Sequence, residues 1–132
     1  SCLLAPLDID VLLVPSMTMT PSGYNRVFGC AKARAVELMT VVAACGTTGT
    51  AINTTNNPTN YSGCSVFTPC EPQLGHSGLF ARAEPGFDDG ADGPLLIAED
   101  VPVGLIRSLR NGDAEVWPGG WSAAHVSVHK HG

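Results

Sequence analysis

The chain has 132 residues, which is the length of one ordinary domain, with 44% hydrophobic residues, 14% charged residues and a formal net charge of −5. Phosphate binding needs clustered lysine and arginine, and the seven basic residues here are scattered, so the composition excludes nucleic acid as a ligand. So little charge on a chain of this size indicates that part of its surface packs against another polypeptide.

No apolar run approaches the roughly 20 residues that cross a bilayer, so we expect no membrane-spanning segment. The cysteines are odd in number, dispersed, and contain no C-x-x-C pair. This usage favours reduced, mostly buried thiols and a cytoplasmic location. The cysteines are Cys2, Cys30, Cys45, Cys64 and Cys70.

The first half of the chain predicts a strand, a helix and a second strand. A buried strand over residues 11–14 ends at Pro15-Ser16, and a polar loop leads to Gly23. A helix is predicted over residues 24–39, with Ser22 as a candidate N-cap. Its apolar positions recur at spacings of three and four, which places one face on a sheet. These positions are Phe28, Ala31, Ala35 and Leu38. The second strand covers residues 40–45 and ends at Gly46.

The second half predicts further strands and a short helix. Residues 47–60 form a long polar loop without periodicity, followed by a strand over residues 61–69 that ends in proline. Residues 79–83 and 95–100 are predicted to pair as antiparallel strands. A short helix over residues 102–110 carries a proline near its first turn. We find no internal repeat and no domain linker, so residues 1–132 are treated as part of one domain.

The ordered motifs in these elements resemble the second half of the carbon–nitrogen hydrolase (nitrilase/amidase) superfamily. The motifs are V-P-S at 14–16, Y-N-R at 24–26, R-A-x-E at 34–37, G-x-S at 63–65, Glu99-Asp100, R-x-x-R at 107–110, and a following tryptophan. The resemblance covers about residues 10–121. It implies an α/β (α+β) fold class, with this chain as the second half of a four-layer αββα sandwich.

The resemblance also implies acyl transfer through a cysteine thioester, with a glutamate moving protons and a lysine stabilising the oxyanion. In the family these three residues precede the V-P-S strand, so we assign no catalytic residue to this chain and expect the Glu-Lys-Cys set upstream of it. Cys2 does not fit the nucleophile. The family places a whole helix between nucleophile and strand, whereas only seven residues lie between Cys2 and Asp10 and one of them is Pro6.

The loop after the V-P-S strand is the predicted contribution to the substrate pocket, because the family uses the corresponding residues near the nucleophile. The candidates are Met17, Thr18, Met19, Tyr24, Asn25 and Arg26. A plain polar turn with methionines packed in a core is the alternative interpretation. Arg26 could bind a carboxylate bidentately or be a surface charge. Arg34 and Glu37 lie one turn apart and are assigned to a structural ion pair.

The histidines near the C-terminus carry the one candidate metal site. His125 and His129 have the i, i+4 spacing of helical zinc ligands, and His131 lies close by. The intervening Val126-Ser127-Val128 favours an extended chain, which separates the two rings. We therefore expect neither a metal nor a cofactor.

Three functions remain open on these observations. The leading hypothesis is the C-terminal chain or subunit of a carbon–nitrogen hydrolase acting on a nitrile or amide. Its N-terminal half would be a separate polypeptide, produced by cleavage or as a second subunit, and the assembly would be a homo-oligomer. The first alternative is a non-catalytic assembly or regulatory module with the same fold. The second is a small Cys/His metalloprotein.

Overall fold

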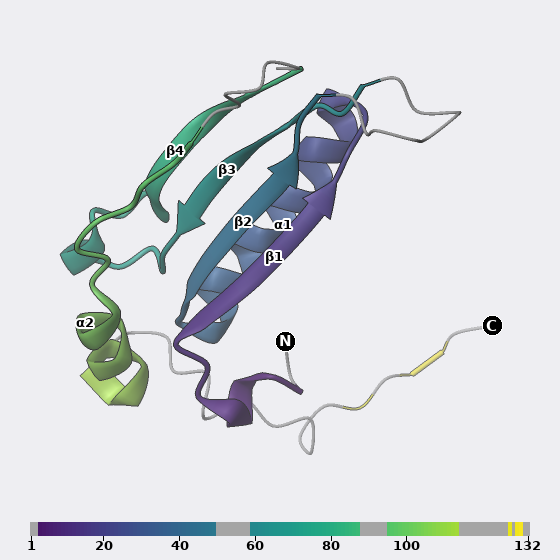
Figure 1. Cartoon of the computed structure of the whole chain (residues 1–132). Coiled ribbons are helices and arrows are strands. Elements are labelled where there is room, and N and C mark those ends of the chain that lie inside the picture. The colour runs from purple at the N-terminus through teal and green to yellow at the C-terminus, as the bar shows by residue number, and fades with distance from the viewer. Residues whose placement is uncertain (1–2, 50–58, 88–94, 114–126, 128, 131–132) are drawn as a thin grey trace.

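The computed structural model describes residues 3–49, 59–87, 95–113, 127 and 129–130. Within them the protein is a mixed α/β structure whose four-stranded sheet has the order β1-β2-β3-β4. Strand β1 (Val11–Met17) runs parallel to β2 (Val41–Thr47), whereas β3 (Ser62–Phe67) and β4 (Leu79–Gly86) continue the sheet in antiparallel fashion. Helix α1 (Pro21–Leu38) connects β1 to β2 and lies across one face of the sheet (Figure 1).

The predicted helix and its buried face are confirmed, but the helix begins three residues earlier than the sequence indicated. Thr20 is the N-cap, and its side chain accepts a hydrogen bond from the backbone N–H of Gly23 at 3.2 Å. Ser22, the predicted cap, lies inside the first turn. Pro21 occupies the first helical position, where its missing N–H has no partner to lose. Met39 ends the helix in the left-handed conformation (φ 47°).

The predicted end of the first strand is wrong. Strand β1 continues through Pro15 and Ser16 to Met17, and Pro15 pairs in register with Cys45 of β2. An edge strand tolerates proline because the lost N–H can face away from the ladder. The second strand is also shifted, since it begins at Val41 and continues past Gly46 to Thr47.

The predicted pairing of residues 79–83 with residues 95–100 is also wrong. Strand β4 pairs instead with β3, through partners that include Val66 and Ala81. Residues 95–100 belong to no strand, and Leu95 and Ile97 are largely exposed. A short apolar run reveals that a segment can form a strand, but long-range packing decides which neighbour it finds.

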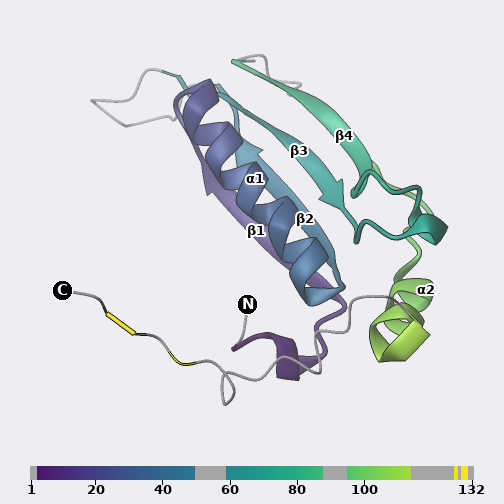
Figure 2. The same ribbon diagram turned by 180° about the vertical axis from the view of Figure 1, so that it is seen from behind.

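The core lies between α1 and the sheet. Tyr24, Phe28, Ala31 and Ala35 of the helix pack on Val42, Ala44 and Phe67 of the central strands, with Leu12 and Val14 of β1 at the margin. Figure 2 shows the helix lying along this face, over the sheet. Phe28 meets the ring of Phe67 edge-on, with centroids 6.4 Å apart. These contacts bury one face of the sheet.

The opposite face of the sheet carries apolar side chains that none of the described residues covers with a helix or strand. Successive strand residues point to opposite faces, so Val11, Leu13 and Met17 of β1 point away from α1. Their side chains are 43%, 71% and 63% exposed. Ala43 and Val66 are a cross-strand pair on this same face. We call this surface, formed by the outward residues of the four strands, the open face.

A second helix, α2 (Val103–Ser108), confirms the predicted short helix and continues into a wide turn over Leu109–Asp113. Two arginines of this segment form hydrogen bonds and ion pairs with the residues just before β1. Arg110 is 5% exposed and donates to the backbone oxygens of Ile9 (2.6 Å) and Met39 (3.4 Å) and to Asp10 Oδ1 (3.0 Å). Arg107 also pairs with the Asp10 carboxylate. These bonds hold α2 and the following turn against the residues that precede β1.

The predicted loop 47–60 and the C-terminal tail fall largely outside the described residues. His125 and His131 lie outside them, whereas His129 is described and is joined to Ser127 Oγ through Nε2 at 3.3 Å. Cys2, whose exclusion as a nucleophile rested on sequence alone, also lies outside. No helix in the described part of the chain is long and apolar enough to cross a membrane.

Candidate functional site

The predicted pocket residues lie where β1 passes into α1, at the C-terminal end of the strand. Thr18 is buried here and donates its hydroxyl to the backbone oxygen of Tyr61 at 2.6 Å. The Tyr61 N–H in turn donates to the oxygen of Thr18 at 2.8 Å. Two reciprocal bonds across 43 positions of sequence fix the loop against the start of β3. This junction is therefore an ordered part of the sheet end rather than a free turn.

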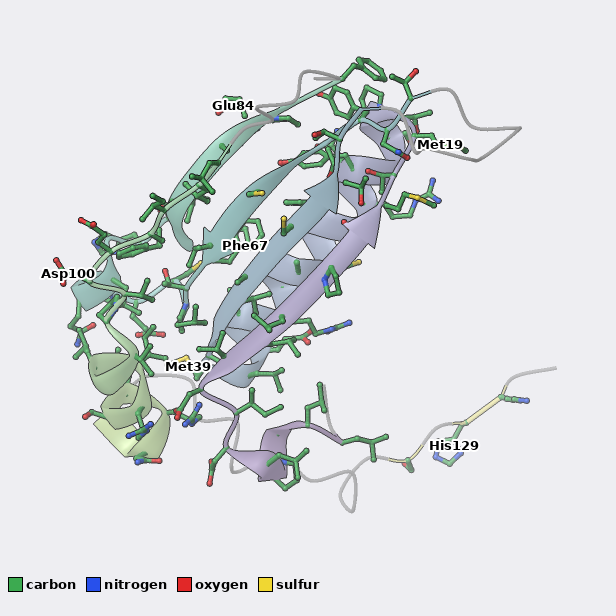
Figure 3. The ribbon with its side chains drawn as sticks, viewed as in Figure 1. Met19, Met39, Phe67, Glu84, Asp100 and His129 are labelled. Atoms are coloured by element: carbon green, nitrogen blue, oxygen red, sulfur yellow. The ribbon has the colours of Figure 1, made fainter. Side chains whose placement is uncertain are left out.

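The two methionines of this junction are not core residues. Met17 is the last residue of β1 and lies on the open face, and Met19 is 55% exposed. Figure 3 shows Met19 near the start of α1, at this end of the sheet. The alternative interpretation, in which both methionines pack into a core, does not hold within this chain. Their flexible apolar side chains are therefore exposed at this end of the sheet.

Tyr24 fills the space between α1 and the strands. It is 5% exposed, with its ring centroid 4.2 Å from that of Phe28 and 5.9 Å from that of Tyr61 in a T-shaped contact. Tyr61 in turn meets Phe87 at 4.8 Å. These successive ring contacts pack against the end of the sheet, so the role of Tyr24 in this structure is packing.

A cavity of about 240 Å³ opens beside Tyr24, between α1 and the helix-facing side of β3 and β4. It combines an aromatic wall with polar groups and contains no carboxylate among its lining residues. The lining consists of Tyr24, Asn25, Phe28, Gly29, Lys32, Ser65, Phe67, Leu79 and Arg82. Ser65, the serine of the G-x-S motif, is 2% exposed and its hydroxyl has no hydrogen-bond partner within the described residues. Lys32 and the Ser65 hydroxyl form the polar wall of this cavity, together with Arg82, which also pairs with Glu84.

Arg26 points to a different part of the surface. It lines a separate cavity of about 300 Å³ on the β1 side of the helix, together with Val14, Val27, Cys30, Ala31 and Arg34. This cavity is mostly apolar and lies beside the unpaired edge of β1. The structure therefore brings Tyr24 and Asn25 together at one cavity and separates Arg26 from them.

The sequence analysis missed Lys32, Ser65 and Arg82. These residues come from α1, β3 and β4 and meet only because the sheet order places β3 and β4 beside the helix. The G-x-S motif was a partial signal, because it marked Ser65 without indicating its face. Arg82 also pairs with the exposed Glu84 at 2.9 Å.

The ion pair predicted between Arg34 and Glu37 is confirmed, and it lies half-exposed on the helix surface. An exposed pair at this spacing contributes only about 0.2–1 kcal/mol, so its role is local. The pair lies on the helix and not at the end of the sheet.

The described cysteines are all thiols, but the prediction that they are mostly buried is wrong, because Cys30, Cys45 and Cys70 are exposed. Cys45 and Cys64 face each other across β2 and β3 on the open face, with their sulfurs 3.2 Å apart. Burial, and then the neighbouring thiol of Cys45, raise the pKa of Cys64 to about 11. No group of three potential metal ligands occurs among the described residues.

Comparison with known proteins gives one informative relative. No protein-family model matches the chain, and no solved structure matches it. A Bacillus subtilis (strain 168) protein described as "Probable hydrolase YhcX" is 26% identical over 100 residues. The match covers 76% of this chain and 18% of the relative, so the chain spans less than a fifth of the relative's length.

Proposed function

We propose that this chain is the C-terminal half of a carbon–nitrogen hydrolase of the nitrilase/amidase type. In this proposal an N-terminal polypeptide supplies the Glu, Lys and Cys that act on a nitrile or amide. The observation that carries the proposal is the open face: the sheet has a helix on one side, and on the other an apolar surface that is exposed along β1 and that no helix or strand of the described residues covers. Parallel strands are normally covered on both faces, so β1 and β2 call for a second layer.

The open face suits a second sheet. In a four-layer sandwich the outward residues of two sheets pack against each other, and Leu13, Met17 and Val66 provide an apolar surface of that kind. Burying exposed apolar area stabilises an assembly by about 25 cal/mol per Å² before the costs of association. An N-terminal half with its own helix-covered sheet would complete the four layers.

The edge of β1 provides a second attachment. Among the described strands β1 has a neighbour on one side only, and its other edge lies beside the apolar cavity lined by Val14 and Ala31. Exposed apolar edge strands tend to pair with a further strand. A strand added here would extend the sheet toward the N-terminal half, and a helix that accompanied it would fill the cavity.

The substrate would bind at the end of β1. Thr18 is held by its two bonds to Tyr61, so it offers a fixed wall, and Met17 and Met19 present apolar side chains beside it. In the proposed reaction the partner's cysteine thiolate attacks the carbon of the substrate. An amide loses ammonia to give a thioester directly, whereas a nitrile gives a thioimidate that adds water and loses ammonia to give the same thioester. A water then hydrolyses the thioester to the carboxylic acid and frees the thiol. The description of the Bacillus subtilis relative as a probable hydrolase supports a hydrolytic reaction.

Activity of the assembled protein tests this proposal. The chain is affinity-purified from its source with whatever polypeptide binds it, and ammonia release is measured on a panel of aliphatic amides and nitriles. Hydroxylamine is added to trap the acyl-enzyme as a hydroxamate. We expect the complex to release ammonia and the isolated chain to release none. Alkylation of the partner's cysteine should abolish the release by the complex.

A matched pair of variants links activity to the open face. Leu13→Asp places a carboxylate on that face and should abolish both partner binding and ammonia release while the chain remains folded. Ala33→Asp places the same charge on the exposed side of α1 and should change neither. Hydrolysis by the isolated chain would overturn the proposal. A complex that forms but releases no ammonia would favour the non-catalytic assembly module.

A further inference from the structure

The open face carries a pair of thiols that the proposed hydrolysis does not use. Cys45 of β2 and Cys64 of β3 are direct partners in the antiparallel ladder, and their Sγ atoms lie 3.2 Å apart. Facing residues of an antiparallel pair have Cα atoms about 4.5–5.5 Å apart, which falls within the range of about 4.4–6.8 Å that a disulfide spans. The backbone therefore already meets the requirement for a bond between them.

We propose that Cys45 and Cys64 form a dithiol site that reacts reversibly with low-molecular-weight disulfides, such as oxidised glutathione, to give a cross-strand disulfide. The inference rests on the register and on the sulfur contact, and it does not depend on the proposed hydrolase function. Cys30 and Cys70 lie outside the paired strands, on α1 and after β3. They are the internal references for the pair.

The reaction proceeds in two exchange steps. The thiolate of Cys45, the exposed member, attacks one sulfur of the oxidised glutathione, which forms a mixed disulfide and releases one reduced glutathione. Cys64 then gives its proton to solvent and attacks the Cys45 sulfur, which breaks the mixed disulfide and releases the second glutathione. Two thiols are oxidised and one disulfide is reduced, so atoms and electrons balance.

The environment of Cys64 assigns the order of these steps. Burial and the adjacent Cys45 thiol raise the pKa of Cys64. The Cys64 thiol therefore stays protonated near neutral pH, so it is not the first of the two to attack. Once Cys45 carries glutathione, the two sulfurs are already in contact and closure is intramolecular. The pair therefore favours the closed disulfide over a lasting glutathione adduct.

The bond would join the two central strands, β2 and β3, on the open face near the C-terminal end of β1. Cys45 is level with Pro15 of β1 in the register, two positions from the strand end at Met17. Under the proposed function, a second sheet would cover this same surface. The accessibility of the dithiol therefore depends on whether the open face is occupied.

Peptide mapping tests the proposal. The reduced protein is incubated with oxidised glutathione, remaining thiols are alkylated with iodoacetamide, and chymotrypsin cleavage after Tyr61 and Phe67 separates Cys45, Cys64 and Cys70. We expect the Cys45 and Cys64 peptides to be joined, with a mass lower by two hydrogen atoms than that of the two thiol peptides. Dithiothreitol should restore both thiols.

Single variants provide the matched controls. Cys45→Ser and Cys64→Ser should abolish the joined product, whereas Cys30→Ser and Cys70→Ser should leave its yield unchanged. Recovery of Cys45 and Cys64 of the wild-type protein as alkylated thiols would overturn the proposal. Lasting separate glutathione adducts, or a bond from Cys45 to another cysteine, would overturn it as well.

A second arm separates this inference from the proposed function. The same reaction is carried out on the chain after its N-terminal polypeptide has bound. Oxidation of the free chain together with protection in the complex supports both proposals. Equal oxidation in both samples supports the dithiol site and contradicts the covering of the open face.

Discussion

The two faces of the sheet are built from the same four strands, yet they have opposite surroundings. On the α1 face, Val42 and Ala44 are almost fully buried against the helix, whereas Leu13 on the open face is 71% exposed. Both faces are apolar, so hydrophobicity does not distinguish them. The difference teaches that apolar composition does not by itself decide burial, since a solvated sheet face normally carries polar residues and the proposed second layer would account for this exception.

Truncation of one leucine on each side gives the largest expected contrast. Leu38 is 4% exposed at the end of α1, so Leu38→Ala should lower the free energy of unfolding by about 2–5 kcal/mol. Leu13→Ala should change it by no more than about 0.5 kcal/mol in the isolated chain. Urea unfolding followed by circular dichroism measures both. Equal losses would mean that the open face is covered within this chain.

A smaller effect is expected at the start of the helix that covers the first face. Thr20→Ala removes the side-chain cap on the Gly23 N–H and should lower the free energy of unfolding by about 0.5–2 kcal/mol. Ser22→Ala is the matched control because Ser22 lies inside the first turn, where alanine is the better helix former. A greater loss in Ser22→Ala than in Thr20→Ala would contradict the observed cap. Thermal unfolding of the two variants decides between them.

The smallest expected effect is a change in stability on acidification, and it comes from Asp10, which precedes β1. Hydrogen bonds from Arg107, and then from Arg110, lower the pKa of Asp10 from 3.8 to about 2. A lowered carboxyl pKa stabilises the folded state above the unfolded pKa, and that stability is lost as the pH falls from about 4 toward 2. The pH dependence of the unfolding midpoint should be shallower in Asp10→Asn over this window. Identical slopes in wild type and variant would exclude a contribution from this carboxylate.

Local signals in the sequence predicted much of the covered side. The spacing of Phe28, Ala31, Ala35 and Leu38 identified the helix and its buried face, and the apolar runs located the first three strands. The sequence predicted the ends of these elements less well. Pro15 indicated a stop at β1 because proline usually breaks a ladder, but the strand lies at the sheet edge and continues to Met17. Element ends depend on neighbours that a local pattern does not contain.

The predicted lining of the candidate site is divided in the structure. Sequence reasoning selected the junction between β1 and α1, where Thr18 is fixed by Tyr61, but it treated six residues as one lining. The structure assigns Asn25 and Arg26 to different sides of the helix, because adjacent helical positions point about 100° apart. Lys32, Ser65 and Arg82 could not be grouped from sequence, since they lie on three separate elements.

What the sequence determined by itself was periodic and local: the amphipathic helix, the apolar strands, and a charge content of 14%. Only the tertiary structure decided which strands became neighbours, that residues 95–100 stayed outside the sheet, and that Cys45 faces Cys64. The physical reason is that pairing and register depend on contacts between residues far apart in the chain. A composition records how many apolar residues exist, and the fold decides which of them are buried and which stay exposed.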